Sequence, residues 1–104
     1  MDLVIHHDGE AGRFETRVDG LRCVLEYTRD GRVVTMTHVR VPAAAAGQGV
    51  ASHLTRTAMD WARNRGLSVV PRCPYVAAWI ERNPDYRDLI EPDSAQGTDS
   101  EDQA

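Results

Sequence analysis

The sequence predicts a small α+β domain, in which an antiparallel β-meander is followed by a helix, a further strand and a second helix. Residues 3–41 alternate between apolar and polar side chains and are interrupted by turn signals, which is typical of half-buried strands. Residues 48–65 then change to the period of a helix. At 104 residues, the chain is long enough for one hydrophobic core and therefore one domain.

Four strands are expected before the helix. Residues 3–7 form a short first strand, and residues 13–18 alternate cleanly between the two faces of a second. Asp-Gly at 19–20 is a strong hairpin signal, so residues 21–28 should return beside that strand. A second turn leads into residues 32–41, which complete an antiparallel sheet with one solvated face.

The helix over residues 48–65 places one apolar stripe on this sheet. The stripe consists of Val50, Leu54, Ala58 and Trp61. Gly66 is a typical residue at a helix C-terminus, and residues 67–70 read as another strand. Pro74 can begin a second helix over residues 75–82, which Asn-Pro at 83–84 would end.

Composition excludes several classes of protein. The N-terminus lacks the basic start and apolar run of a secretory signal, so we expect a cytoplasmic location without membrane binding. The net charge of −4 arises mainly from the C-terminal end, because residues 91–104 contain five acidic residues and no basic one. The remaining body is nearly neutral, which gives no reason to expect nucleic-acid binding. Residues 92–104 contain no large apolar side chain and are predicted to be a disordered acidic tail after a domain over 1–91.

The cysteines and histidines do not have the spacing of metal ligands, so no metal site is expected. His6 and His7 read as a surface pair at a strand end. Cys23 falls on an apolar strand face, which indicates core packing. Cys73 differs, because it lies between Arg72 and the expected helix start at Pro74, and both a positive charge and a helix N-terminus favour a thiolate.

The segment from Val41 to Ala51 contains the clearest candidate site. A strand ends at Pro42, a loop of small residues follows, and Gly47 and Gly49 precede the long helix. Glycines allow close backbone approach, and a helix N-terminus offers free N–H groups to a phosphate. A plain strand-to-helix turn is the alternative explanation. A Rossmann loop would need a third glycine, and a Walker loop would need Gly-Lys-Ser/Thr.

Longer motifs resemble the GNAT acetyltransferases, in particular their small single-domain members. These motifs are His-Val-Arg-Val-Pro at 38–42, Gly-Gln-Gly-Val-Ala at 47–51, Val-Pro-Arg-Cys-Pro-Tyr-Val at 70–76 and Arg-Asn-Pro-Asp-Tyr at 82–86. The resemblance implies a GNAT-like fold over residues 3–91 and acetyl-CoA as cofactor. It places the CoA pyrophosphate on Gly47, Gln48, Gly49, Val50 and Ala51. Ala46 departs from the family pattern, which has arginine or glutamine at that position.

The resemblance also implies roles for individual residues. The backbone at Val39 and Val41 would align the pantetheine, and Tyr75 would lie near the cofactor. Cys73 would carry the acetyl group or lie beside the thioester. His38 is expected on the strand face of Val34 and Met36, and its imidazole, which titrates near neutral pH, is the candidate base.

The expected activity is transfer of an acetyl group to an amine, either a small molecule or a protein lysine or N-terminus. The small size leaves little room for an enclosed acceptor pocket, and we expect a monomer or weak homodimer. Two other hypotheses remain open. One is a non-catalytic CoA-binding module, which the missing side chain at Ala46 would suit, and the other is an interaction protein that uses the acidic tail.

Overall fold

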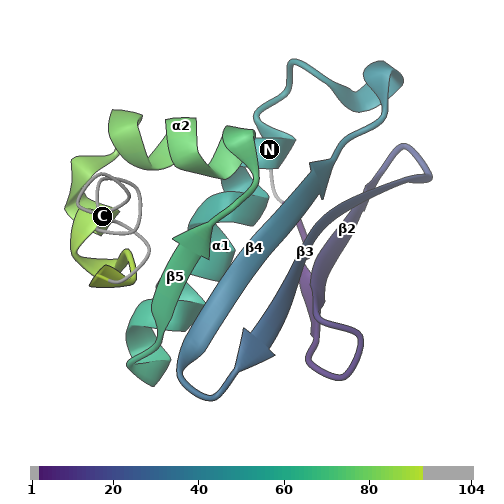
Figure 1. Cartoon of the computed structure of the whole chain (residues 1–104). Coiled ribbons are helices and arrows are strands. Elements are labelled where there is room, and N and C mark those ends of the chain that lie inside the picture. The colour runs from purple at the N-terminus through teal and green to yellow at the C-terminus, as the bar shows by residue number, and fades with distance from the viewer. Residues whose placement is uncertain (1–2, 93–104) are drawn as a thin grey trace.

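The computed structural model describes residues 3–92, and the strands in this range form one five-stranded sheet. Its strands are β1 (His6–Asp8), β2 (Arg13–Val18), β3 (Leu21–Asp30), β4 (Val33–Arg40) and β5 (Ser68–Pro71). The helices in this range are α1 (Val50–Arg65), α2 (Pro74–Arg82) and the 3-10 helices η1 (Ala43–Ala45) and η2 (Pro84–Leu89). Figure 1 shows α1 crossing behind the sheet, with α2 near the end at which β5 stops. The predicted α+β class is confirmed.

The strands follow chain order across the sheet. Successive pairs from β1 to β4 are antiparallel, whereas β5 pairs in parallel with β4 because α1 connects them. The Asp19–Gly20 hairpin forms as predicted, with both residues at positive φ (53° and 79°), as a type I′ turn requires. Predicted and observed bounds agree closely, except that β1 begins at His6 and the two 3-10 helices were not predicted.

The core lies between the sheet and α1. Phe14, Thr16 and Val18 of β2 are buried, as their alternation predicts, and they face the same layer as Leu54 and Ala58 of α1. The opposite sheet face carries rows of charged side chains. Glu15 there forms ion pairs with Arg13, two residues away on the same strand, and with Arg22, a diagonal neighbour on β3.

A β-bulge interrupts the pairing of β3 with β4. Tyr27 lies opposite Met36 and Glu26 lies opposite His38, so Thr37 is an extra residue on β4. The Thr37 hydroxyl donates a hydrogen bond to the Glu26 carbonyl (3.3 Å). One inserted residue reverses the direction of every later side chain, because side chains alternate with a period of two. Val39 therefore packs against the core, whereas His38 points to the charged face.

The short strand β1 is held by an aromatic cluster around His7. Its imidazole stacks on Phe14 with ring centroids 4.1 Å apart and lies edge-on to Trp61 at 4.8 Å. His7 Nε2 is also 2.6 Å from the Tyr27 hydroxyl. His6 and His7 are both solvent-exposed, as predicted, although the His7 ring also packs against this cluster.

The end of the described chain returns to the sheet. Ile90 forms a parallel bridge with Val69 of β5, and the Glu91 amide donates to the Val69 carbonyl (2.8 Å). The acidic tail predicted to be disordered spans residues 92–104, and all of it after Pro92 lies outside the described range. In residues 3–92, the helices are too short or too polar to cross a membrane.

Candidate functional site

The loop between β4 and α1 has the conformation that its glycines permit. Gly47 and Gly49 have φ values of +83° and +78°, a region that side chains with a Cβ rarely adopt. A Cβ at either position would meet no atom within 4 Å, so the requirement is for backbone conformation and not for space. The same open space would allow a ligand to approach the loop backbone closely.

The start of α1 is not capped by any side chain. Gly49 is the N-cap, and its carbonyl accepts the His53 amide (3.0 Å). The amides of Val50, Ala51 and Ser52 precede that bond and have no acceptor among residues 3–92. The first turn also contains no acidic side chain. These N–H groups and the positive end of the helix dipole form an arrangement suited to an anion.

A pocket of about 230 Å³ joins this helix start to neighbouring elements. It is lined by Val41, Ala45, Ala46, Gly47, Gly49, Val50, Ala51, Ser52 and Tyr75. The pocket thus brings together most of the residues predicted to bind a cofactor. Two of those residues lie outside the lining, because the side chain of Gln48 is exposed and Val39 packs partly into the core.

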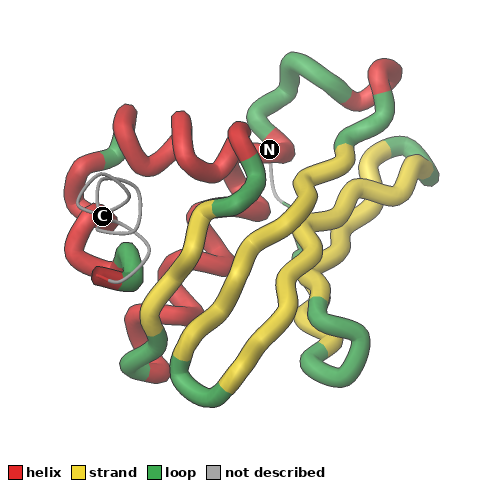
Figure 2. The backbone as a smooth tube through the Cα atoms, in the orientation of Figure 1, coloured by secondary structure: helices red, strands yellow, loops and turns green. Residues whose placement is uncertain are grey.

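β4 and β5 separate beside this pocket. Their parallel pairing ends with Met36 opposite Pro71, and the last connection is the Cys73 amide donating to the Met36 carbonyl (2.9 Å). Figure 2 shows β4 continuing beyond the end of β5. The edge of β4 after Met36 therefore has no partner strand within the described residues, which leaves its backbone open to an extended ligand.

Cys73 lies where the two strands separate. It is the N-cap of α2, with Pro74 at the first helical position as predicted, and its carbonyl accepts the Ala77 amide (3.0 Å). Only 7% of the residue is exposed, and its side chain belongs to the hydrophobic core cluster. The other cysteine, Cys23, is fully buried, and this burial raises the pKa of its thiol.

The predicted position of His38 is wrong in one respect. We expected it on the face of Val34 and Met36, but the bulge at Thr37 turns it to the opposite face. Its side chain is 57% exposed, and Nδ1 lies 3.6 Å from Oε1 of Glu26. The sequence alternation could not show this, because neither Thr37 nor His38 is apolar and either could face solvent.

Contacts between α1, α2 and η2 support the site and were not predicted. Trp79 Nε1 donates to the Ser52 hydroxyl (2.8 Å), and the Tyr86 hydroxyl donates to Asp60 (2.7 Å). Asn83 closes the C-terminus of α2 by donating to the Trp79 carbonyl (2.8 Å). The Asn-Pro-Asp-Tyr motif at 83–86 thus has a structural role. The sequence feature that could have indicated this role is the position of these polar residues directly after a predicted helix.

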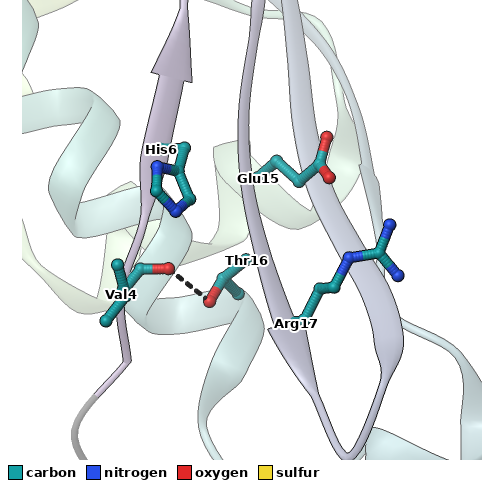
Figure 3. A pocket seen from close by; sticks show the side chains of 5 residues that line it. All are labelled: Val4, His6, Glu15, Thr16 and Arg17. Atoms are coloured by element: carbon teal, nitrogen blue, oxygen red, sulfur yellow. Dashed lines mark hydrogen bonds between the residues drawn. The ribbon is translucent and has the colours of Figure 1, made fainter.

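Elsewhere, residues 3–92 contain no cluster of three or more potential metal ligands. A separate pocket of about 330 Å³ lies at the β1–β2 edge, where the Thr16 hydroxyl donates to the Val4 carbonyl (2.7 Å; Figure 3). It contains none of the residues predicted to be functional.

Comparisons with known proteins agree with this architecture. The family model described as GCN5-related N-acetyl-transferase matches residues 13–89. Protein NATD1 of Mus musculus is 32% identical over 93 residues, which cover 85% of this chain and 84% of the relative. Protein NATD1 of Homo sapiens is also 32% identical over 93 residues, with 85% and 82% covered.

A solved structure shows the same fold. The NMR solution structure of a GCN5-like protein from Staphylococcus aureus superimposes with a TM-score of 0.69 at 22% sequence identity. The match covers 86% of this chain and 88% of that protein. The GNAT-like fold expected from the sequence motifs is therefore confirmed.

Proposed function

Because this chain belongs to the GCN5-related N-acetyltransferase family, we propose that it transfers an acetyl group from acetyl-CoA to an amine. The observation that carries the proposal is the pocket at the uncapped start of α1, which lies beside the point where β4 and β5 separate. This pocket offers anion-binding amides, and the neighbouring strand offers an open backbone edge. Fold alone would not support a specific activity.

The residues around the pocket fit a CoA molecule. The amides of Val50–Ser52 would bind the pyrophosphate, and the open space at Gly47 and Gly49 would admit it. The backbone of β4 from Val39 to Val41 would align the pantetheine, and Tyr75 would cover it from α2. Bound acetyl-CoA would supply the thioester, an activated acyl group. The pocket lining provides no arginine or glutamine at Ala46, so binding would depend mainly on backbone groups.

Two residues are proposed to take part in the transfer. His38 faces the solvated side of the sheet, so an amine could reach it from solvent. Its imidazole would take the proton that the amine loses as the new C–N bond forms. Cys73 lies at the strand separation, where its thiol would either accept the acetyl group first or pack beside the thioester.

The test is intact mass spectrometry with acetyl-CoA, followed by product analysis with several amines. The panel should include a peptide N-terminus, a lysine peptide and a polyamine. Cys73→Ala should abolish a stable acetyl adduct if that cysteine carries the group, and Cys23→Ala serves as the matched buried-cysteine control. An adduct in wild type and Cys23→Ala only would establish the covalent route, whereas turnover by Cys73→Ala would establish direct transfer.

A non-catalytic CoA-binding module is the second candidate. It is favoured by Ala46 in the pocket lining and by the burial of Cys73. Retention of CoA without acetylation of any amine in the panel would support this alternative. Turnover of one amine above the uncatalysed rate would eliminate it, and failure to bind CoA would overturn both candidates.

A further inference from the structure

The β-bulge brings a carboxylate within ion-pair distance of the candidate base. Glu26 and His38 are cross-strand partners, and Nδ1 is the imidazole nitrogen that lies 3.6 Å from Glu26 Oε1. Without the bulge, His38 would share the buried face of Met36 and could not meet Glu26. The Thr37 hydroxyl, which donates to the Glu26 carbonyl, holds this irregularity in place.

Arg40 limits the freedom of the same carboxylate. Its Nη2 lies 3.5 Å from Glu26 Oε1, the oxygen that also faces His38. Arginine remains charged at any ordinary pH, so its attraction holds the carboxylate on the sheet face. The side chain of Glu26 is 36% exposed, compared with 63% for Arg40 and 57% for His38. The Glu26 carboxylate is therefore less exposed than either of the two side chains, Arg40 and His38, that contact it.

The contact has a chemical consequence for the imidazole. An ionised carboxylate can only accept hydrogen bonds, so a neutral histidine that faces it through Nδ1 is favoured with the proton on Nδ1. The unprotonated nitrogen is then Nε2, on the opposite side of the ring. A base must present this unprotonated nitrogen to its substrate. In histidines generally, the hydrogen bond made by one ring nitrogen determines which of the two nitrogens carries the proton.

We propose that Glu26 is a positioning residue, which fixes the ring orientation and tautomer of His38 so that Nε2 faces the amine acceptor. This inference rests on the proposed function for its catalytic meaning, although the tautomer itself can be measured independently. In the acetyl transfer, the amine nitrogen would bond to the acetyl carbon while the carbon–sulfur bond of the thioester breaks and the sulfur leaves as a thiolate, and His38 Nε2 would take the proton that the amine releases. Glu26 exchanges no proton and acts only through the imidazole.

The experiment combines nitrogen-15 NMR of the histidine side chains with steady-state kinetics. Spectra are recorded at about pH 8, where an ordinary histidine is neutral. The His38 signal is identified among those of the four histidines by its absence from a His38→Gln variant. Glu26→Gln removes the charge with little change in size. Glu15→Gln is the matched control, because Glu15 lies on the same sheet face and also contacts two cationic side chains.

We expect wild-type His38 to carry its proton on Nδ1, and Glu26→Gln to lose this preference while Glu15→Gln keeps it. The kcat of Glu26→Gln should fall about tenfold with little change in KM, a part of the roughly 10²–10⁴-fold that a general base contributes. A His38 tautomer that is unchanged in Glu26→Gln, or already Nε2-protonated in wild type, would overturn the proposal. An unchanged kcat would do the same.

The proposed function can fail separately. If the tautomer responds to Glu26→Gln but wild-type protein acetylates no amine, the acetyltransferase assignment is wrong and the Glu26–His38 pairing stands. Circular dichroism and thermal unfolding of each variant exclude misfolding, since a solvated glutamate replaced by glutamine should leave the fold intact. Both outcomes can therefore be read from the same set of proteins.

Discussion

The indole Nε1 of Trp79 donates a 2.8 Å hydrogen bond to the hydroxyl of Ser52, which joins α2 to the first turn of α1. Trp79 is almost completely buried, and Ser52 lines the pocket at the helix start. The contact therefore connects the second half of α2, the helix that begins after Cys73, to the first turn of α1 beside the glycine loop.

Ser52→Ala should destabilise the fold by about 1–3 kcal/mol, because the buried indole N–H would lose its acceptor. Denaturant unfolding measures the change. Asn64→Ala, at an exposed position of the same helix, is the control and should change stability by less than about 0.5 kcal/mol. Equal stability of Ser52→Ala and wild type would show that this bond is not important.

Gly49→Ala should weaken CoA binding by about tenfold, since a side chain at φ +78° costs roughly 1–3 kcal/mol and the loop would change conformation to avoid it. Isothermal titration with CoA measures the affinity. Gly31→Ala is the control, because Gly31 also has positive φ (62°) but lies in the β3–β4 turn. That variant should lose stability and keep its affinity for CoA.

Stability should fall as the pH drops below the ordinary histidine range. Burial lowers the pKa of His7, and the positive charge of Arg65 lowers it further, while Asp8 acts in the opposite direction. The folded state therefore binds fewer protons at this site than the unfolded state, so the stabilising contribution is complete above a pH of about 6.5 and is lost as protons bind.

Urea unfolding at pH values on both sides of that range tests this linkage. His7→Phe keeps a ring in the stack with Phe14 but cannot titrate, so its stability should depend less on pH than that of wild type. The His6→Phe variant changes the exposed neighbour and should behave like wild type. If His7→Phe and wild type lose stability in parallel, His7 is not the responsible group.

Tyr86→Phe should cost about 1 kcal/mol, because the Tyr86 hydroxyl donates to Asp60 and accepts from Arg56. The bond to Asp60 and partial burial also raise the pKa of the Tyr86 phenol, so this contact persists through neutral pH. Thermal unfolding measures the change. Tyr75→Phe, in which the lost hydroxyl makes no hydrogen bond within residues 3–92, should unfold close to the wild-type temperature.

Much of the fold could be predicted because local signals and tertiary packing agree. Asp19–Gly20 determines the hairpin, and the apolar period of 48–65 anticipates α1. The bulge at Thr37 was not predicted, because Thr37 and His38 are both polar and their order gives no evidence of an inserted residue. The 3-10 helix η2 was also missed, because it depends on the distant contact of Tyr86 with Asp60. The loop site was found from local glycines, whereas Glu26 was missed because it reaches the site through strand pairing.

The return of the chain beside β5 protects the sheet against self-association. Unpaired strands at sheet edges are templates on which another molecule can add a strand and begin to aggregate. Ile90 and Glu91 occupy part of the β5 edge through their pairing with Val69. The last described residues therefore cover part of this edge. A protein truncated after Leu89 should aggregate more readily than the full chain.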